Sequence, residues 1–398
     1  MSNLVNTEKQ SSVMNTYARF PLTIVKGKGS YVWDDQGEKY LDFTSGIATC
    51  NLGHVPDTVQ EALKQQLDTL WHVSNLYHIP NQEKLAGILT ENSVMDAVFF
   101  CNSGAEANEA AIKLAKKYAK DKGNEERTEI VTFKQSFHGR TGTTMAATAQ
   151  EKIHQGFTPL TPGFRYLPYN NMDALKKIDN GKTTAVLLEL IQGEGGVHVA
   201  DKEWIQALAH LCKEQDILLM FDEVQTGIAR TGTLFAYEQY DVEPDVITLA
   251  KGLGSGFPIG AMLAKKHAAA SFAPGTHGST FGGNPLAATA GYATVKTIIE
   301  EQIAENVKQM SGYFLEILKD LKEEFSEVKG IRGKGLLLGL EIEGDAAEYI
   351  TALREKKVLA LSAGEHVLRI LPPLTTTTKE IDAFIQALTE VLKGRCHQ

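Results

Sequence analysis

The chain has 398 residues, of which 43% are hydrophobic and 22% are charged, a composition typical of a globular protein with a large core. Its 49 acidic and 40 basic side chains give a formal net charge of -9, which argues against nucleic acid or an anionic membrane as the main partner. No apolar run is long enough to span a bilayer, and the N-terminus lacks a basic segment followed by an apolar one. We therefore expect a cytoplasmic protein without a membrane span or a secretion signal.

The chain begins with a predicted hairpin, in which Gln36 and Gly37 form the turn. The middle of the chain alternates short, continuous apolar runs with helical patterns. The apolar runs predict buried strands over 129–133, 184–190, 217–223 and 246–251. The clearest helix follows Ser103, because small and apolar residues recur after it at helical spacing. Ser103 and Glu106 have the spacing of a capping box.

The C-terminal part has a different pattern. A helical stretch is expected from about 285 to 323, strands over 331–342, 358–363 and 367–372, and a last helix from about 378 to 394. The sequence therefore predicts an α/β fold with a mostly parallel central sheet, helices on both faces, and a small α+β domain built from both chain ends. The expected divisions are an N-terminal segment, 1–50, that joins the small domain, a large domain, 51–284, and a C-terminal small domain, 285–398.

The cysteine pattern agrees with a reducing compartment. Cys50, Cys101, Cys212 and Cys396 lie far apart, and no C-x-x-C motif is present. This spacing favours reduced thiols over a disulfide framework or a zinc site, so we predict no metal site.

Two polar residues end buried strands in the middle of the chain. Lys251 closes the apolar run VITLAK before the glycine-rich GLGSGFPIG, and Asp222 closes ILLMFD. Ligand sites in open α/β sheets lie at the carboxyl ends of strands, where a partly desolvated lysine can form a Schiff base. Pyridoxal phosphate needs a group that keeps its pyridinium nitrogen protonated. Alone, Lys251 fits an ordinary strand-end lysine and Asp222 fits a helix N-cap, but together they favour a pyridoxal-phosphate site.

Further residues could complete such a site on the cofactor side. Gln225 lies three residues after Asp222 and could reach the phenolic oxygen of the cofactor. Ser103, Gly104 and Ala105 put small residues and backbone N–H groups at a helix N-terminus, which can bind a phosphate. Small-residue helix starts also occur without a phosphate, so this match depends on the other residues.

Two other motifs carry candidate contacts to the cofactor and to the substrates. In SFHGRTG, Phe137 can stack on a pyridine ring and Arg140 can hold a carboxylate, whereas His138 has no visible partner and is interpreted as structural. Arg369 lies inside the apolar run HVLRILPP, and Glu194 lies in IQGEGG. A buried arginine is costly without a counter-charge, so Arg369 is either paired or binds an anionic ligand.

Six motifs occur together in the order that one known family shows. They are SGAEANEAA, SFHGRT, IQGEGG, FDEVQTG, LAKGLGSGFPIGA and GSTFGGNPLA, and the likeness extends from about residue 17 to about residue 373. On these motifs the chain resembles the class III (subgroup II) pyridoxal-phosphate aminotransferases of fold type I. It departs from the family pattern at Leu190, where many relatives have proline, at Ala229, which replaces a common glycine, and in the shortened loop LGHVPD.

The resemblance implies roles for these residues. Lys251 would carry pyridoxal 5'-phosphate covalently and move a proton during catalysis. Asp222 would hold the pyridinium nitrogen, Gln225 would hold the phenolic oxygen, and Phe137 would stack on the ring. The resemblance also implies cofactor contacts from Ser103, Gly104, Ala105, Glu223, Val224 and Thr280.

The resemblance also implies a homodimer and two small-molecule substrates. Thr280 would reach the cofactor phosphate of the other subunit, with Ser279 beside it near the substrate. SGIATCNLGH, LWHVSNLYH and GSTFGGNPLA are most similar to members that transfer the amino group of N-acetylornithine to 2-oxoglutarate in arginine biosynthesis. Arg140 would then bind the acetylornithine carboxylate and Arg369 the α-carboxylate of glutamate or 2-oxoglutarate, while Glu194 pairs with Arg369 when the first substrate is bound.

Alternatives remain open within this family. Ornithine, succinylornithine and 4-aminobutyrate are alternative amino donors, and an aminomutase would share the fold and the cofactor residues. The presence of Arg140, Arg369 and Glu194 favours a two-substrate transferase. A binding protein without activity is disfavoured because Lys251 is present.

Overall fold

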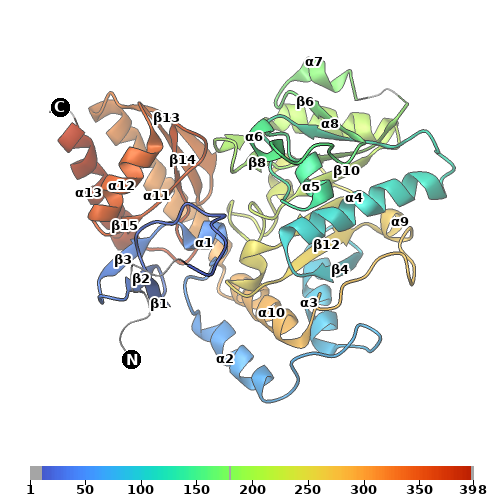
Figure 1. The fold of residues 1–398 in the computed structure, drawn as a ribbon, viewed down its shortest axis with the longest axis horizontal. Helices are drawn as coiled ribbons and strands as arrows, with labels where there is room; N and C mark the ends of the chain where they lie inside the picture. The colour runs from blue at the N-terminus through green and yellow to red at the C-terminus, as the bar shows by residue number, and fades with distance from the viewer. Residues whose placement is uncertain (1–10, 179–180, 396–398) are drawn as a thin grey trace.

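The computed structural model describes residues 11–178 and 181–395 (Figure 1). Its centre is a seven-stranded sheet in which β12 runs antiparallel to both neighbours and the other six strands run in one direction. In spatial order the strands are β4 (Ala97–Cys101), β12 (Gly260–Ala264), β11 (Val246–Leu249), β10 (Leu218–Asp222), β7 (Thr183–Leu188), β5 (Glu129–Phe133) and β6 (Phe164–Leu167). The carboxyl ends of the six parallel strands therefore lie at one edge of the sheet.

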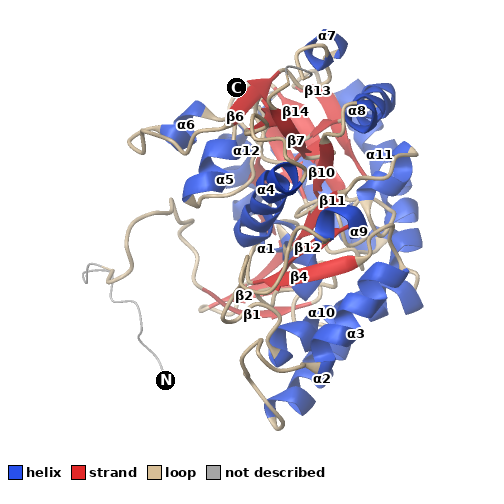
Figure 2. Ribbon diagram, turned by 90° about the vertical axis from the view of Figure 1, so that its right-hand side faces the viewer, coloured by secondary structure: helices blue, strands red, loops and turns tan. Residues whose placement is uncertain are grey.

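The continuous apolar runs of the sequence arise because helices cover both faces of this sheet. In β10, Leu219 and Phe221 pack into one core with α8 (Lys202–Glu214). Leu218 and Met220 point the other way and pack with α4 (Gly104–Asp121), as the alternation of side chains along a strand requires. The two helices lie on opposite sides of the sheet (Figure 2).

Short elements and a group of helices complete this part of the chain. The short helices are α1 (Ser45–Ala48), α5 (Gly142–Ala147), α6 (Glu151–His154), α7 (Met172–Leu175), α9 (Lys266–Ala269) and the 3-10 turns η1 (Ala236–Tyr240) and η2 (Lys251–Gly254). The strands β8 (Ile191–Gln192) and β9 (His198–Val199) form a small hairpin. The helices α2 (Asp57–Leu67), α3 (Pro80–Glu91) and α10 (Pro285–Glu300) lie side by side at the lower edge of the molecule in Figure 1.

Both chain ends build a second, smaller unit with its own apolar core (Figure 1). The N-terminal strands are β1 (Ile24–Lys28), β2 (Tyr31–Asp34) and β3 (Lys39–Asp42), and β3 pairs in parallel with β15 (Val358–Leu359). The C-terminal sheet has the order β13 (Val328–Lys334), β14 (Leu337–Ile342), β17 (Val367–Ile370) and β16 (Leu361–Ser362). Its helices are α11 (Ile303–Glu324), α12 (Ala346–Glu355) and α13 (Thr378–Arg395).

The expected fold class is confirmed, whereas the domain boundaries at 50/51 and 284/285 stay predictions. Three expected elements differ in detail. The strand expected over 358–363 is two short strands, β15 in the sheet of β3 and β16 in the sheet of β17. The helical stretch expected from 285 to 323 is two helices, because Gln302 between them has a φ of +51°. The strand expected over 331–342 is a hairpin, because Gly335, with a φ of +60°, turns the chain between β13 and β14.

Two further expectations concern the cysteines and the membrane. Cys50, Cys101 and Cys212 are free thiols, while Cys396 lies outside the described residues. Among the residues that the structure describes, no helix is long and apolar enough to cross a membrane.

Candidate active site

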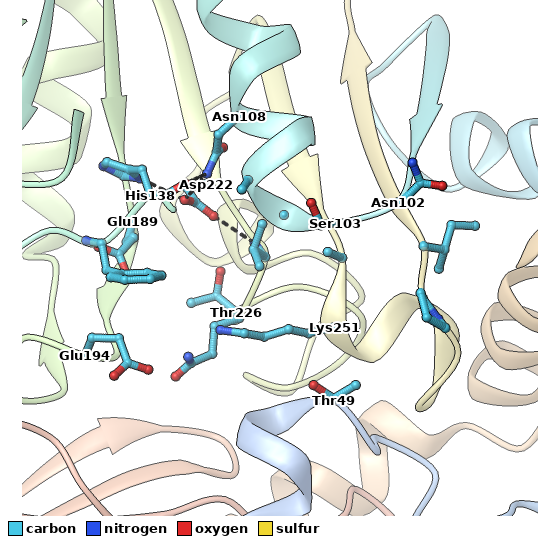
Figure 3. A pocket seen from close by; sticks show the side chains of 18 of the residues that line it. Thr49, Asn102, Ser103, Asn108, His138, Glu189, Glu194, Asp222, Thr226 and Lys251 are labelled. Carbon is cyan, nitrogen blue, oxygen red and sulfur yellow. Dashed lines mark hydrogen bonds and ion pairs between the residues drawn. The ribbon is translucent and has the colours of Figure 1, made fainter. Parts of the chain in front are cut away.

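A cavity of about 350 Å³ lies at the edge of the sheet where the parallel strands end (Figure 3). Residues that follow successive strands line it: Ser103 after β4, Phe137 after β5, Glu189 after β7, Asp222 at the end of β10 and Lys251 after β11. The remaining lining residues include Gly104, Ala105, Asn108, His138, Glu194, Val224, Gln225, Thr226 and, from the N-terminal part of the chain, Thr49. The strand ends thus bring together side chains that are far apart in the sequence.

The Lys251 side chain extends into this cavity (Figure 3). Its backbone has a φ of +40° at the start of η2, a conformation that residues other than glycine rarely adopt. Burial lowers the pKa of the Lys251 ammonium, and the positive charge of Arg369 acts in the same direction, against the negative charges of Glu194 and Asp222. A lowered pKa increases the fraction of neutral amine, which is the nucleophilic form.

The Asp222 carboxylate is buried and held by three hydrogen bonds. Its Oδ2 accepts from Nδ2 of Asn108 and pairs with Nδ1 of His138, each at 2.8 Å, and its Oδ1 accepts from the backbone N–H of Val224 at 3.1 Å (Figure 3). The sequence indicated a structural role for His138 without a visible partner, and the structure shows that partner: His138 orients Asp222. Asn108 was also missed; its only signal is a polar residue within the apolar face of α4.

The N-terminus of α4 faces the cavity (Figure 3). Ser103 caps the helix by accepting a hydrogen bond of 3.2 Å from the backbone N–H of Glu106. The Glu106 carboxylate reaches the backbone N–H of Asn102 rather than that of Ser103, so the expected capping box is shifted by one residue. A Cβ on Gly104 would lie 2.7 Å from Cγ1 of Val224. Glycine is therefore required where this anion-binding helix end meets the segment after β10.

Phe137 forms another wall of the cavity and is half-buried. Its backbone N–H donates a hydrogen bond of 2.9 Å to Oε2 of Glu189, a residue that the sequence analysis did not single out. The Arg140 guanidinium carbon lies 5.7 Å from the centre of the Phe137 ring. Arg140 is exposed and is not among the residues that line this cavity.

An ion pair closes the side of the cavity next to the small unit. Nη1 of Arg369, a buried residue of β17, lies 2.6 Å from Oε1 of Glu194 and donates a second bond of 3.0 Å to the Gly193 carbonyl. Burial opposes ionisation of Glu194, but the charge and hydrogen bond of Arg369 lower its pKa below the usual range. The pairing that the resemblance implied for these two residues is thus present in this structure. Gln225 lines the cavity nearby, and its buried Oε1 has no hydrogen-bond partner.

Five candidate residues do not line this cavity: Arg140, Arg369, which adjoins it through Glu194, and Glu223, Ser279 and Thr280. The Glu223 carboxylate points away and accepts hydrogen bonds from the backbone N–H groups of Ala236 and Tyr237, at 2.7 and 2.9 Å, and burial raises its pKa to about 8. Ser279 is half-buried, and its Oγ accepts from the backbone N–H of Gly282 at 2.9 Å. Thr280 is exposed. The site therefore has a lysine, a held carboxylate, an aromatic wall and an anion-binding helix end within one cavity.

Comparison with known proteins assigns this arrangement to a family. The chain matches the family model described as Aminotransferase class-III over residues 12–392, so it belongs to the class-III aminotransferases. Among individual proteins, it is 69% identical over 385 residues to the acetylornithine aminotransferase of Oceanobacillus iheyensis, with 97% of this chain and 96% of the relative covered.

Two solved structures are also similar. The N-acetylornithine aminotransferase of Stenotrophomonas maltophilia is 37% identical with a TM-score of 0.84, over 96% of this chain and 98% of that chain. The ornithine aminotransferase of Toxoplasma gondii, crystallised in the presence of oxidised glutathione and with partial occupancy of pyridoxal phosphate at its active site, is 31% identical. Its TM-score is 0.93, over 97% of this chain and 94% of that chain.

Proposed function

We propose that this chain catalyses the transfer of the δ-amino group of N-acetylornithine to 2-oxoglutarate, which gives N-acetylglutamate semialdehyde and glutamate, a reaction of arginine biosynthesis. One observation carries the chemical class: Lys251, Asp222 and the N-terminus of α4 meet in one cavity. The substrate follows from the 69% identity with an acetylornithine aminotransferase. Cytoplasmic localisation stays a prediction.

The residues in the cavity fit pyridoxal phosphate. Gln225 lines the cavity with a buried Oε1 that has no partner, and Nε2 of the same amide can donate a hydrogen bond to the phenolic oxygen. The Gly104 position leaves no room for a Cβ and lies at a helix end that favours an anion. Asp222, with His138 and Asn108 behind it, is a suitable partner for a protonated pyridine nitrogen.

Each residue then has a defined task. When bound, pyridoxal phosphate supplies an electron sink for the substrate carbon that loses a proton. Lys251 would hold the cofactor through its Nζ until the substrate amine displaces it, and the freed Lys251 amine would then take up and return the proton of the substrate carbon. Asp222 keeps the pyridine nitrogen protonated, Phe137 supports the ring, and the backbone of Gly104 and Ala105 binds the phosphate.

The Arg369–Glu194 pair allows one cavity to accept two substrates in turn. With Glu194 on Arg369, the arginine is neutralised, as in this structure, and we propose that acetylornithine then binds with its carboxylate at Arg140. When Glu194 moves aside, Arg369 can bind the α-carboxylate of glutamate or 2-oxoglutarate in bidentate fashion. The pair thereby avoids an unpaired buried charge in either state.

Ornithine is the second candidate donor, because the ornithine aminotransferase of Toxoplasma gondii has a TM-score of 0.93 with this chain. The lower identity of that protein, 31%, makes this donor the alternative. Succinylornithine, 4-aminobutyrate and an aminomutase reaction are not favoured by any specific contact.

We also propose a homodimer with shared active sites. Segments 70–78 and 279–282 lie together, because Nδ2 of Asn75 donates to the Ser279 carbonyl at 2.9 Å and the rings of His72 and Phe281 are 5.1 Å apart. These segments expose large apolar side chains: Leu70, Trp71, Leu76, Tyr77 and Phe281. Such a patch is typical of a protein interface. A second copy that covers it would bring Thr280 to the cofactor phosphate of its partner.

The proposed reaction is tested by incubating the purified protein with pyridoxal phosphate, N-acetylornithine and 2-oxoglutarate and measuring glutamate by mass spectrometry. We expect glutamate to form with the wild type and to be undetectable with Lys251→Ala. The control is Lys202→Ala, since Lys202 pairs with Asp241 on the surface. If the Lys251→Ala variant turned over as fast as the wild type, the mechanism would be rejected. If the wild type used ornithine but not acetylornithine, ornithine would be the amino donor instead.

A further inference from the structure

Glu189 is a buried carboxyl group in the candidate active site without a role in the reaction as described so far. It follows directly after β7, is 7% exposed and lines the cavity (Figure 3). Its backbone carbonyl accepts a hydrogen bond of 2.8 Å from the Tyr169 hydroxyl, which fixes its main chain. A carboxyl group withdrawn from water requires compensating interactions, so its contacts indicate what it does.

The Glu189 side chain connects two neighbouring strand ends. Its Oε2 accepts the hydrogen bond of 2.9 Å from the backbone N–H of Phe137. Phe137 follows β5, which pairs in parallel with β7 so that Val131 lies opposite Val186. The bond therefore holds the peptide group that carries the Phe137 ring, and supporting hydrogen bonds of this kind set the position of residues that contact a ligand.

The surroundings of Glu189 disfavour a negative charge. Burial raises the pKa of Glu189 well above its usual range, and the charges of Asp222 and Glu194 act in the same direction. The Phe137 N–H and the positive charge of Lys251 oppose this shift without reversing it. A neutral carboxylic acid still has an acceptor oxygen, so the bond to Phe137 does not require ionisation.

We propose that Glu189 is a positioning residue that holds the Phe137 ring in the wall of the cofactor site, through an acceptor oxygen and without the need for a negative charge. This rests on the proposed function, because it assumes that pyridoxal phosphate lies beside Phe137. Glu189 would thus act on the cofactor through Phe137.

Two substitutions separate the acceptor oxygen from the charge. Glu189→Gln keeps an acceptor oxygen of the same reach, whereas Glu189→Leu keeps a similar volume and removes the acceptor. We expect the Gln variant to bind pyridoxal phosphate within about twofold of the wild type and the Leu variant about tenfold more weakly, as for one hydrogen bond lost at a buried donor. The dissociation constant is measured from cofactor released by the holoenzyme on serial dilution.

Hydrogen exchange provides a readout that does not depend on activity. The Phe137 amide should exchange slowly in the wild type and in Glu189→Gln, and faster in Glu189→Leu, as followed by mass spectrometry of a peptide covering 134–140. A Gln variant that behaves like the Leu variant in exchange or in affinity would overturn the proposal.

A double-mutant cycle with Phe137→Leu tests whether Glu189 acts through Phe137. We expect the dissociation constant of the double variant for the cofactor to lie within about twofold of that of Phe137→Leu alone. If the losses of affinity caused by the two single substitutions multiply in the double variant, the proposal is contradicted. If Glu189→Leu has a lowered melting temperature, Glu189→Ala is measured in its place, and we expect the same loss of cofactor affinity. A wild type that binds no pyridoxal phosphate would defeat the proposed function instead, so the two failures are distinguishable.

Discussion

At the scale of single residues, two arginines and one carboxylate determine which substrate the proposed site accepts. Arg369 is buried and paired with Glu194, whereas Arg140 is exposed. A buried cation released from its partner binds a carboxylate strongly, because little water competes for it. The burial of Arg369 and the exposure of Arg140 agree with the division of labour that we propose for the two arginines.

We predict that Arg369→Ala lowers kcat/KM for the glutamate half-reaction at least about thirtyfold, since loss of a desolvated charge partner costs roughly 2 kcal/mol or more. The acetylornithine half-reaction should fall much less. Each half-reaction is measured separately by single-turnover absorbance. Arg354→Ala, on α12 with its guanidinium over Phe20, is the matched control. Equal losses in both half-reactions would reject the division of labour.

Sequence alone indicated Lys251, Asp222, Arg369 and Glu194, because each is a charged group at a strand end or inside an apolar or glycine-rich run. It did not indicate how Asp222 is held. Its partners Asn108 and His138 lie 114 and 84 positions away, so their meeting depends on how α4 packs on the sheet and on β5 lying one strand beyond the neighbour of β10. Glu189 was missed for the same reason, since its partner comes from the neighbouring strand end.

At the scale of elements, the close approach of α4 to the segment after β10 shapes the proposed phosphate site. We predict that Gly104→Ala weakens binding of pyridoxal phosphate about tenfold, because overpacking of this kind typically costs 1–3 kcal/mol. A Cβ at this position would lie 2.7 Å from Val224, which must then move. The measurement is cofactor affinity by absorbance titration.

The control is Gly312→Ala, in the exposed interior of α11, where a Cβ would meet nothing within 4 Å. It should leave cofactor affinity unchanged and raise stability slightly, because alanine favours a helix over glycine by about 1 kcal/mol. Unchanged affinity in Gly104→Ala would show that the helix end does not form the cofactor site.

Four strands of the central sheet, β5, β7, β10 and β11, could be predicted closely because continuous apolar runs are distinctive; the run expected over 129–133 is β5, Glu129–Phe133. The strands β4, β6 and β12 were not predicted. The break between α10 and α11 could not be predicted from the sequence pattern. Apolar residues continue across it, and Gln302 adopts its left-handed conformation without a glycine or proline to indicate a turn. Gly335, by contrast, is a visible signal for the β13–β14 turn within the apolar run 331–342, which predicts one strand.

At the scale of the whole molecule, the exposed apolar residues of segments 70–78 and 279–282 form a patch of the kind that protein interfaces cover. We predict that Leu76→Glu converts the proposed homodimer to monomers and lowers aminotransferase activity at least about tenfold, because a charge in the centre of an interface is strongly unfavourable. Leu76 is 89% exposed in the single chain. Light scattering after size-exclusion chromatography measures the mass.

Met172→Glu is the control, since Met172 is 55% exposed on α7, at the far side of the central sheet in Figure 1. It should remain a dimer with full activity. A wild type that is monomeric and active at micromolar concentration would contradict the shared active site.

The proposed site removes the amino group of N-acetylornithine, and the most direct test is the visible absorption of the holoenzyme mixed with one amino donor and no keto acid. We predict that the absorption band of the bound cofactor bleaches fastest with N-acetylornithine and more slowly with ornithine or 4-aminobutyrate. Addition of 2-oxoglutarate should then restore the band. A band that N-acetylornithine leaves unchanged, while another donor bleaches it, would contradict the account.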